Sequence, residues 1–377
     1  MVAAEPNAPA DTWRGWIALR MVRGVGPVVY QGLLRAFGNP AAVLGASVHA
    51  LECAGVRPDV ARAIHRFDRW TQADKQVDRL QRCRARLITW SDADYPDLLR
   101  RIHDPPPFLI VTGTLEARDG LAVAVVGSRN VSAYALRLTR ELTEGLVHHG
   151  VTVISGLARG TDAAAHWAAL RAGGRTIAVL GSGIDVVYPS EHHSLFRAIA
   201  TQGAIVTELL MGTKPDAENF PHRNRIVSGL ALGTIVVEAG EKSGSLITAN
   251  LAAEQGREVF AVPGTVGDGT RGTHRLIRNG AKLTERVEDV LEELAPQLLS
   301  RRATVAAPAL APTEAAVMDS LRGGTVHIDQ IIGRTGMAPG IALQVLLALE
   351  LKGLVEQRPG KHFVARAVDG VRCPPQG

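Results

Sequence analysis

The feature that most constrains the fold is a series of short, almost wholly apolar runs rich in β-branched residues, each ending at or near a glycine or an acidic residue. Amphipathic segments such as 134–150 and 245–256 separate several of them. Runs without polar alternation are typical of strands buried on both faces of a parallel sheet. Their alternation with helical segments predicts an α/β fold, an extended Rossmann-like, doubly wound and mostly parallel sheet. The predicted strands are 121–127, 151–156, 176–181, 204–208, 233–240 and 258–264.

Residues 1–88 have a different pattern, in which short helical segments are broken by glycine-containing turns. Two helix, turn, helix units follow one another, and this predicts an N-terminal all-α domain that resembles SAM or helix-hairpin-helix modules. The turn glycines Gly24, Gly26 and Gly55 either make tight turns only or let backbone amides face a DNA phosphate. The Rossmann-like domain is predicted to occupy residues 89–295.

The last part of the chain predicts a linker and a small separate domain. Residues 296–312 are rich in Pro and Ala without helical or strand periodicity, which indicates a linker. Residues 313–377 read as three helices and a hairpin that turns at residues 358–360, the plan of a winged helix. The third helix has almost no Arg or Lys, so docking to a protein is as good an interpretation as reading of DNA.

Charge and composition limit the functions that the chain can have. The first 90 residues contain 13 Lys and Arg against 7 Asp and Glu, whereas residues 91–310 contain 22 against 24. A polyanion site in the central domain must therefore be a local pocket. Because only 4% of the residues are aromatic, such a site depends on amides and cations more than on stacked rings.

The cysteines and the N-terminus indicate a cytoplasmic protein. Cys53, Cys83 and Cys373 are far apart and form no metal-binding or disulfide pattern. No run of about 18 apolar residues is present, and the first residues do not resemble a signal peptide. We therefore expect no metal and no membrane association.

Glycine-rich loops follow the predicted strands, at the edge where an open α/β sheet binds its ligands. Gly127, Ser128 and Arg129 lie between a strand and a helix, where N-terminal amides and a guanidinium favour phosphate. The alternative is that Arg129 only caps a neighbouring carbonyl.

The loop after the next strand contains Ser155, Gly156 and Gly160, and the two glycines suit a close ligand approach. In the same segment, Asp162 and His166 are interpreted as a helix cap and a packed helix residue.

The segment 219–264 carries the densest group of candidate ligands. A basic cluster lies beside an aromatic ring suited to base stacking, and it consists of Phe220, His222, Arg223, Asn224 and Arg225. A second loop opens a helix with Lys242, Gly244 and Ser245, which is again chemistry suited to phosphate. The order of these residues is not that of a Walker A loop, and no complete dinucleotide fingerprint is present. We therefore expect neither ATP nor NAD as a cofactor.

At this point the chain resembles the DprA/Smf family of DNA-processing proteins. The resemblance is carried by VAVVGSRNVSAYA, VISGLARGTDAAAH, TIAVLGSGIDVVYPSEH and, above all, by NFPHRNRIVSGLALGTIVVEAGEKSGSLITANLAAEQGREVFAVPG. It is dense over residues 90–295 and looser in the flanking domains. Carried over by position, the DNA pocket of the family falls on Arg129, Phe220, Arg223, Asn224, Arg225, Lys242, Gly244 and Ser245.

The resemblance implies a single-stranded DNA-binding protein that forms a homodimer through the Rossmann-like domain. It also implies a partner, the RecA recombinase, which such a protein helps to load during natural transformation or recombination, and it implies no catalytic residue. Two alternatives remain open, a nucleotide-cleaving phosphoribohydrolase-like enzyme and a winged-helix transcription regulator. Against the enzyme, the helix after the Lys242 loop has no acidic residue before Glu254, so a general acid or base is missing there.

Overall fold

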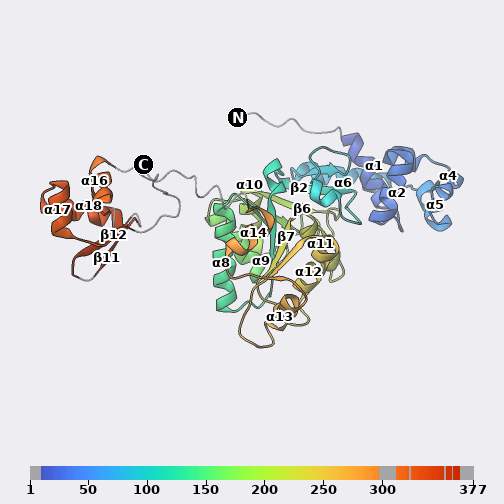
Figure 1. Cartoon of the computed structure of the whole chain (residues 1–377). Coiled ribbons are helices and arrows are strands. Elements are labelled where there is room, and N and C mark those ends of the chain that lie inside the picture. The colour runs from blue at the N-terminus through green and yellow to red at the C-terminus, as the bar shows by residue number, and fades with distance from the viewer. Residues whose placement is uncertain (1–9, 297–310, 322–323, 352–353, 359, 366–377) are drawn as a thin grey trace, which may run out of the picture. The chain divides into compact units, whose positions relative to one another are not determined.

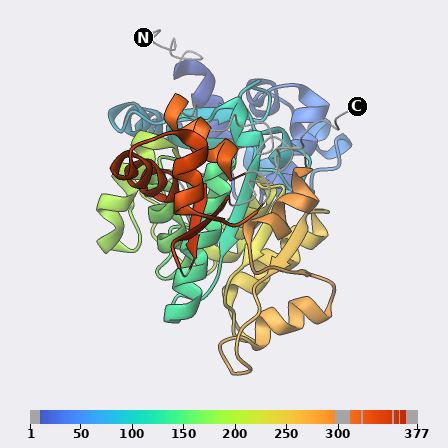
Figure 2. The same ribbon diagram turned by 60° about the vertical axis from the view of Figure 1, so that its left-hand side comes forward.

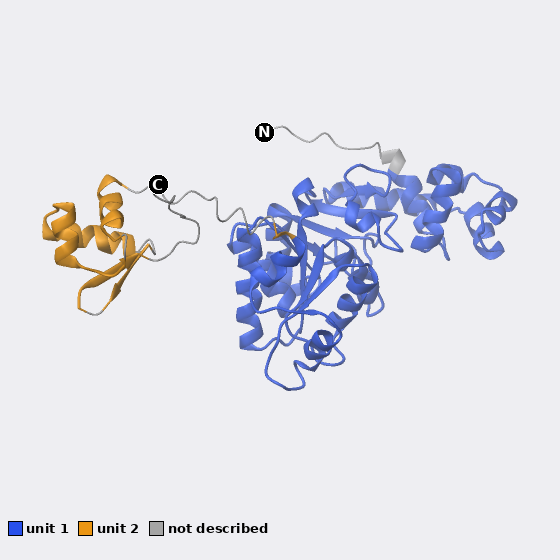
Figure 3. Cartoon of the chain, in the orientation of Figure 1, with its two compact units in different colours: residues 1–294 blue, residues 295–377 orange. Residues whose placement is uncertain are grey.

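The structure, a computed structural model, describes residues 10–296, 311–321, 324–351, 354–358 and 360–365. It forms two compact units, residues 1–294 and 295–377 (Figure 3). Apart from its end residues, the predicted linker lies outside the described residues, as do Pro359 of the predicted hairpin turn and Cys373.

The N-terminal helices form the two helix, turn, helix units that the glycines predict. Gly24 and Gly55 have positive φ angles of +90° and +84°, a conformation that glycine adopts without a steric penalty. A Cβ on Gly24 would lie 2.7 Å from a methyl group of Val60, so the first turn packs closely against the second unit. The helices are α1 (Ala10–Arg20), α2 (Pro27–Phe37), α3 (Pro40–Leu44), α4 (Val48–Cys53), α5 (Pro58–His65) and α6 (Trp70–Arg82).

A nine-stranded sheet, in the order β1-β2-β6-β5-β4-β3-β7-β8-β9, forms the centre of the first unit (Figure 1). All pairs from β6 to β9 are parallel, whereas β1 and β2 add an antiparallel edge. The predicted, mostly parallel sheet is thus confirmed. The strands are β1 (Arg86–Thr89), β2 (Phe108–Gly113), β3 (Ala122–Val126), β4 (Thr152–Ser155), β5 (Thr176–Val179), β6 (Ala204–Thr207), β7 (Gly233–Val236), β8 (Glu258–Ala261) and β9 (Lys282–Leu283).

Helices cover both faces of this sheet, as a doubly wound fold requires. Figure 1 shows α8 and α9 on one side of the sheet and α11 and α12 on the other, and the turned view of Figure 2 keeps the green and yellow helices apart. Each face has its own apolar core; Ile226 and Leu246 belong to one, Leu195 and Ile199 to the other. The helices are α7 (Asp97–Arg100), α8 (Ala133–His148), α9 (Thr161–Arg171), α10 (His193–Gln202), α11 (Asn219–Gly229), α12 (Gly244–Glu254), α13 (Arg271–Arg278) and α14 (Val287–Leu294), with two 3₁₀ turns, η1 (Ala117–Gly120) and η2 (Ser190–His192).

The N-terminal helices and the sheet share one apolar core. Ile17 and Leu80 of the helices belong to the same buried cluster as Leu195 under the sheet. Polar contacts cross the same boundary, because Arg79 pairs with Asp185 and the amide of Met211 donates to Gln76 at 2.8 Å. The helices and the sheet therefore form one compact unit, and a domain boundary near residue 88 stays a prediction from the sequence pattern.

The second unit is a winged helix with its own small core around Val317, Ile331 and Phe363. Its strands pair in the order β10-β12-β11. The elements are α16 (Pro312–Ser320), β10 (Val326–His327), α17 (Ile328–Thr335), α18 (Pro339–Leu351), β11 (Val355–Arg358) and β12 (His362–Ala365).

No single helix among the described residues has the length and apolar composition to span a membrane; Ile328–Thr335 and Pro339–Glu350 meet that test only together, across a bend of 109°. The described residues also contain no group of three or more His, Cys, Asp or Glu side chains placed to hold a metal ion.

Candidate nucleic-acid interface

A cavity of about 830 Å³ opens at the carboxyl ends of β3, β4 and β7. The chain leaves β3 toward β4 on one side and leaves β7 toward β8 on the other, although β3 and β7 are direct neighbours. This divergence is the point at which doubly wound sheets bind ligands. Three cations and one acid line the cavity, namely Arg129, Arg223, Lys242 and Asp162. A locally basic pocket is thus present in a domain that is acidic on balance.

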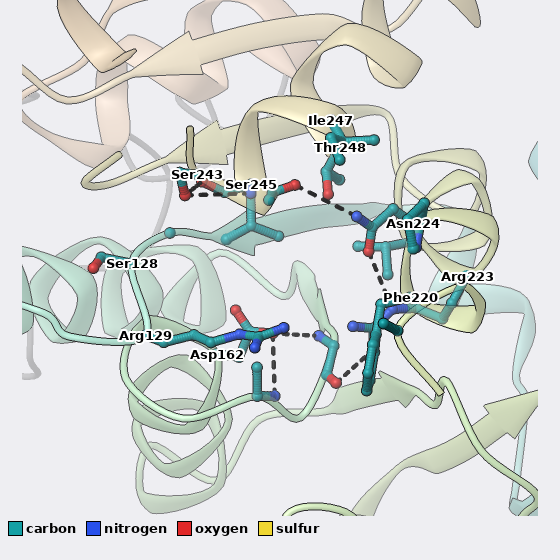
Figure 4. Close-up of a pocket in the computed structure, with 18 of the residues that line it drawn as sticks. Ser128, Arg129, Asp162, Phe220, Arg223, Asn224, Ser243, Ser245, Ile247 and Thr248 are labelled. Atoms are coloured by element: carbon teal, nitrogen blue, oxygen red, sulfur yellow. Dashed lines mark hydrogen bonds between the residues drawn. The ribbon is translucent and has the colours of Figure 1, made fainter. Parts of the chain in front are cut away.

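Arg129 and Lys242 are the two exposed cations of the cavity. Arg129 belongs to the loop between β3 and α8, and Lys242 to the turn between β7 and α12. Within the described part of the chain, neither side chain has an acidic partner. Figure 4 shows Arg129 reaching into the cavity from the β3 loop. Both charges are therefore available to an anion.

The start of α12 forms one wall of the cavity. Ser243 caps the helix by accepting from the amide of Ser245, and the two hydroxyl oxygens lie 2.8 Å apart. Asn224 of α11 donates to the carbonyl of Gly244 at 3.5 Å, so it ties the two helices together at this wall. No atom outside its chain neighbours lies within 4 Å of a Cβ built on Gly244. The positive end of the helix dipole here faces open space, an arrangement that favours an anion.

Phe220 lies in the middle of the cavity, and guanidinium groups lie near its ring. The Cζ atoms of Arg129 and Arg223 lie 5.6 Å and 5.9 Å from the ring centroid, within the range of cation–π attraction. A Cβ on Gly181 would approach the ring to 2.7 Å. The ring is thus packed closely on one side and holds the cations in the cavity.

Arg223 differs from the loop ligand that the sequence suggested. It lies on helix α11 and is buried, with only 6% of its surface exposed. Its guanidinium donates to the carbonyl of Gly156 at 2.5 Å and to that of Val179. Burial lowers the pKa of Arg223 to about 10. Because its hydrogen bonds go to loops that follow β4 and β5, Arg223 is foremost a positioning residue for the cavity floor.

Asp162 is the acid of the cavity, and its carboxylate is engaged by the backbone. It accepts from the amides of Gly156 and Ala158 at 3.1 and 3.2 Å. Burial raises the pKa of Asp162, while Arg223 and the two amides act in the opposite direction. His166, one turn further along α9, is fully buried. Both residues therefore match the structural interpretation that the sequence favoured.

Arg225 and His222 do not line the cavity. Arg225 is buried and forms a two-armed ion pair with Glu208 at 2.9 and 2.8 Å, and a further pair with Asp104 at 2.8 Å. His222 is exposed outside the cavity, and its carbonyl accepts from Arg225. The structure gives Arg225 a structural partner on β6, which explains its position without a ligand.

The small residues of the predicted site make room for the protein's own groups. A Cβ on Gly156 would lie 2.6 Å from the Arg223 guanidinium, and one on Gly160 would lie 2.3 Å from the carbonyl oxygen of Ser128. Gly127 faces Thr161 in the same way, and Ser155 is buried, donating to the carbonyl of Val125. Gly127 and Gly156 line the cavity, whereas Ser155 and Gly160 lie behind it.

Two residues of the site were not singled out from the sequence. Glu238, directly after β7, accepts from the amide and the hydroxyl of Ser132 and so joins the two loops that carry Lys242 and Arg129. An acid at the end of a buried strand is its sequence signal. Tyr188 lies 5.8 Å from Phe220, ring centre to ring centre, and lines the cavity. Its position depends on the loop after β5, which has no regular pattern.

The fold and the site define a class, a Rossmann-like protein with an anion-binding cavity at the switch point of its sheet and a separate winged helix. Residues 86–295 match the family model of DNA recombination-mediator protein A, and residues 301–361 match that of the DprA winged helix domain. The chain belongs to the DprA/Smf family of DNA-processing proteins.

Similar proteins cover most of the chain. Protein Smf of Synechocystis sp. is 34% identical over 93% of this chain and 98% of its own length. The X-ray structure of DNA processing protein A from Streptococcus pneumoniae covers 77% of this chain and 99% of that one, with 34% identity and a TM-score of 0.66. A structure of DNA processing protein A from Helicobacter pylori, described for its single-stranded DNA binding mode, covers 56% of this chain and 96% of that one, with 28% identity and a TM-score of 0.51.

Proposed function

We propose that this protein binds single-stranded DNA in the cavity between the β3 and β7 loops, with little preference for sequence. The observation that carries the proposal is the placement of two exposed cations, Arg129 and Lys242, on neighbouring strands at the switch point of the sheet. Together with the start of α12 they offer charge and amides to successive phosphates. The Helicobacter pylori relative, which is described as binding single-stranded DNA, supports the choice of ligand.

The biological role that fits this site is that of a recombination mediator without catalysis. Such a protein would protect exposed or incoming single strands and help to load the RecA recombinase during transformation or recombination. It would act as a homodimer through the Rossmann-like domain. Membership of a recombination-mediator family supports this role.

The acid of the cavity supports a binding function over a hydrolytic one. Asp162 is buried, and one of its carboxylate oxygens already accepts two backbone hydrogen bonds. A general acid or base needs a carboxyl group that can reach the reacting atom, whereas this one organises the β4 loop. The winged helix offers α18, a helix without Lys or Arg, and this favours docking to a protein over reading of a DNA groove.

A titration of the whole protein with labelled single-stranded and double-stranded oligonucleotides, at two salt concentrations, tests the proposal. We expect tighter binding of the single strand and a marked loss of affinity at the higher salt concentration, because phosphate contacts release counterions. Equal affinity for both forms of DNA, or affinity that does not change with salt, would contradict it.

A further inference from the structure

The geometry points to Tyr188, and not Phe220, as the ring on which an unpaired base of the bound strand stacks. This inference rests on the proposed function, because it names a further contact for the same single strand. It adds a second wall to the site, opposite in chemistry to the cations, and a reason for preferring single strands to duplexes.

The surroundings of Phe220 make it a poor platform for a base. It is half-buried, the Gly181 backbone packs against its ring at a distance that would not admit a Cβ, and the guanidinium groups of Arg129 and Arg223 lie within 6 Å of its centroid. A base could stack there only if a cation left the ring. Phe220 therefore holds the cations that meet the phosphates.

Tyr188 has the free surface that Phe220 lacks. Its side chain is 44% exposed although it lines the cavity, and no cation lies over its ring among the described residues. The two rings are tilted by 41°, so Phe220 supports Tyr188 from one side without covering it. The neighbouring Arg159 is paired with Glu191 at 2.5 Å, which holds that cation in an ion pair of its own.

The chemistry of the ligand follows from this arrangement. Stacking on one aromatic ring is tolerant of sequence, because every base has a π face. A strand whose phosphates lie on Arg129 and Lys242 can turn a base toward the opposite wall, where Tyr188 lies. In a duplex the bases are paired and stacked on each other, and none can offer a face to the ring without being unpaired at a cost in free energy.

The test measures fluorescence anisotropy with two labelled oligonucleotides of equal charge and about 15 nucleotides, one of thymidines and one of abasic sites. Tyr188→Ala should weaken binding of the thymidine strand about ten-fold and leave binding of the abasic strand almost unchanged. Tyr188→Phe should bind as the wild type does. Lys242→Ala should weaken both strands alike, because it removes a phosphate contact.

Tyr134→Ala is the matched control, since Tyr134 is also 44% exposed but does not line the cavity; it should bind both strands normally. The inference is overturned if Tyr188→Ala binds the thymidine strand like the wild type, or loses the same factor on both strands. A wild type that binds neither strand would instead overturn the proposed function, so the two failures are distinguishable.

Discussion

At the scale of single residues, the three arginine and lysine positions predicted to bind phosphate have different tasks. Arg129 and Lys242 are exposed, whereas Arg223 is buried and satisfies the carbonyls of Gly156 and Val179. Arg223→Ala should therefore lower the free energy of unfolding by about 1–3 kcal/mol, because it leaves buried acceptors without a donor. Arg129→Ala should change it by less than about 0.5 kcal/mol.

Urea denaturation of both variants measures this difference. Equal stability of Arg223→Ala and Arg129→Ala would show that the buried guanidinium does not support the fold.

His166 predicts a pH dependence of stability. Burial lowers the pKa of His166 to about 3, and its Nδ1 lies 2.6 Å from the hydroxyl of Thr176. The unfolded chain binds a proton near pH 6.5 that the folded chain refuses down to about pH 3. This contribution to stability is therefore complete above pH 6.5 and is lost as the pH falls toward 3, by at most about 1.4 kcal/mol for each pH unit.

Replacing His166 with Asn keeps a donor for Thr176 and removes the titration. Unfolding by urea at pH 7 and pH 5 should show a smaller loss of stability in His166→Asn than in the wild type. The same loss in both proteins would mean that His166 is not held neutral.

The sequence could predict which loops form the site but not what each cation contacts. The GSRN and GEKSGS loops follow strands, and the topology alone brings them together. The segment FPHRNR contains two arginines, and only contacts with distant elements distinguish them: Arg223 contacts the loops after β4 and β5, and Arg225 contacts Glu208 and Asp104. No local pattern records those partners.

At the scale of elements, the six predicted strands are confirmed as β3 to β8, since β-branched runs buried on both faces leave little ambiguity. The antiparallel edge of β1 and β2 was not predicted, because the direction of pairing depends on residues far apart in the chain. Helix α11 was interpreted as a loop. Its polar segment has no apolar stripe, and Pro221 lies in its first turn, where proline is tolerated.

The contact between the β4 and β3 loops gives a prediction at this scale. Gly160 has a φ angle of +75° and touches the carbonyls of Ser128 and Arg129. Gly160→Ala should destabilise the fold by about 1–3 kcal/mol and weaken DNA binding, because the loop that carries Arg129 must move. Thermal unfolding and anisotropy measure the two effects.

Gly173→Ala is the control, since Gly173 has a φ angle of +73° but no neighbour within 4 Å of a Cβ. It shares the backbone strain and not the loop contact. If the two variants lost the same stability and both kept full DNA affinity, the β4 loop would have no part in shaping the site.

At the scale of the whole molecule, the account makes one central claim, that the switch-point cavity of the first unit is where the single strand binds. The sheet order explains why residues more than 100 positions apart, Arg129 and Lys242, belong to one site. The sequence predicted this convergence from the crevice rule for open α/β sheets, and the structure places both residues in one cavity.

The measurement that tests this claim most directly is the salt dependence of single-strand binding in the wild type, Arg129→Ala, Lys242→Ala and the double variant. Each lost phosphate contact should reduce the slope of log K against log salt concentration by about 0.7, and the double variant should lose about twice that. Arg140→Ala, an exposed arginine of α8 that does not line the cavity, should leave the slope unchanged. Slopes and affinities equal to those of the wild type in all the cavity variants would place the DNA elsewhere on the protein and contradict the claim.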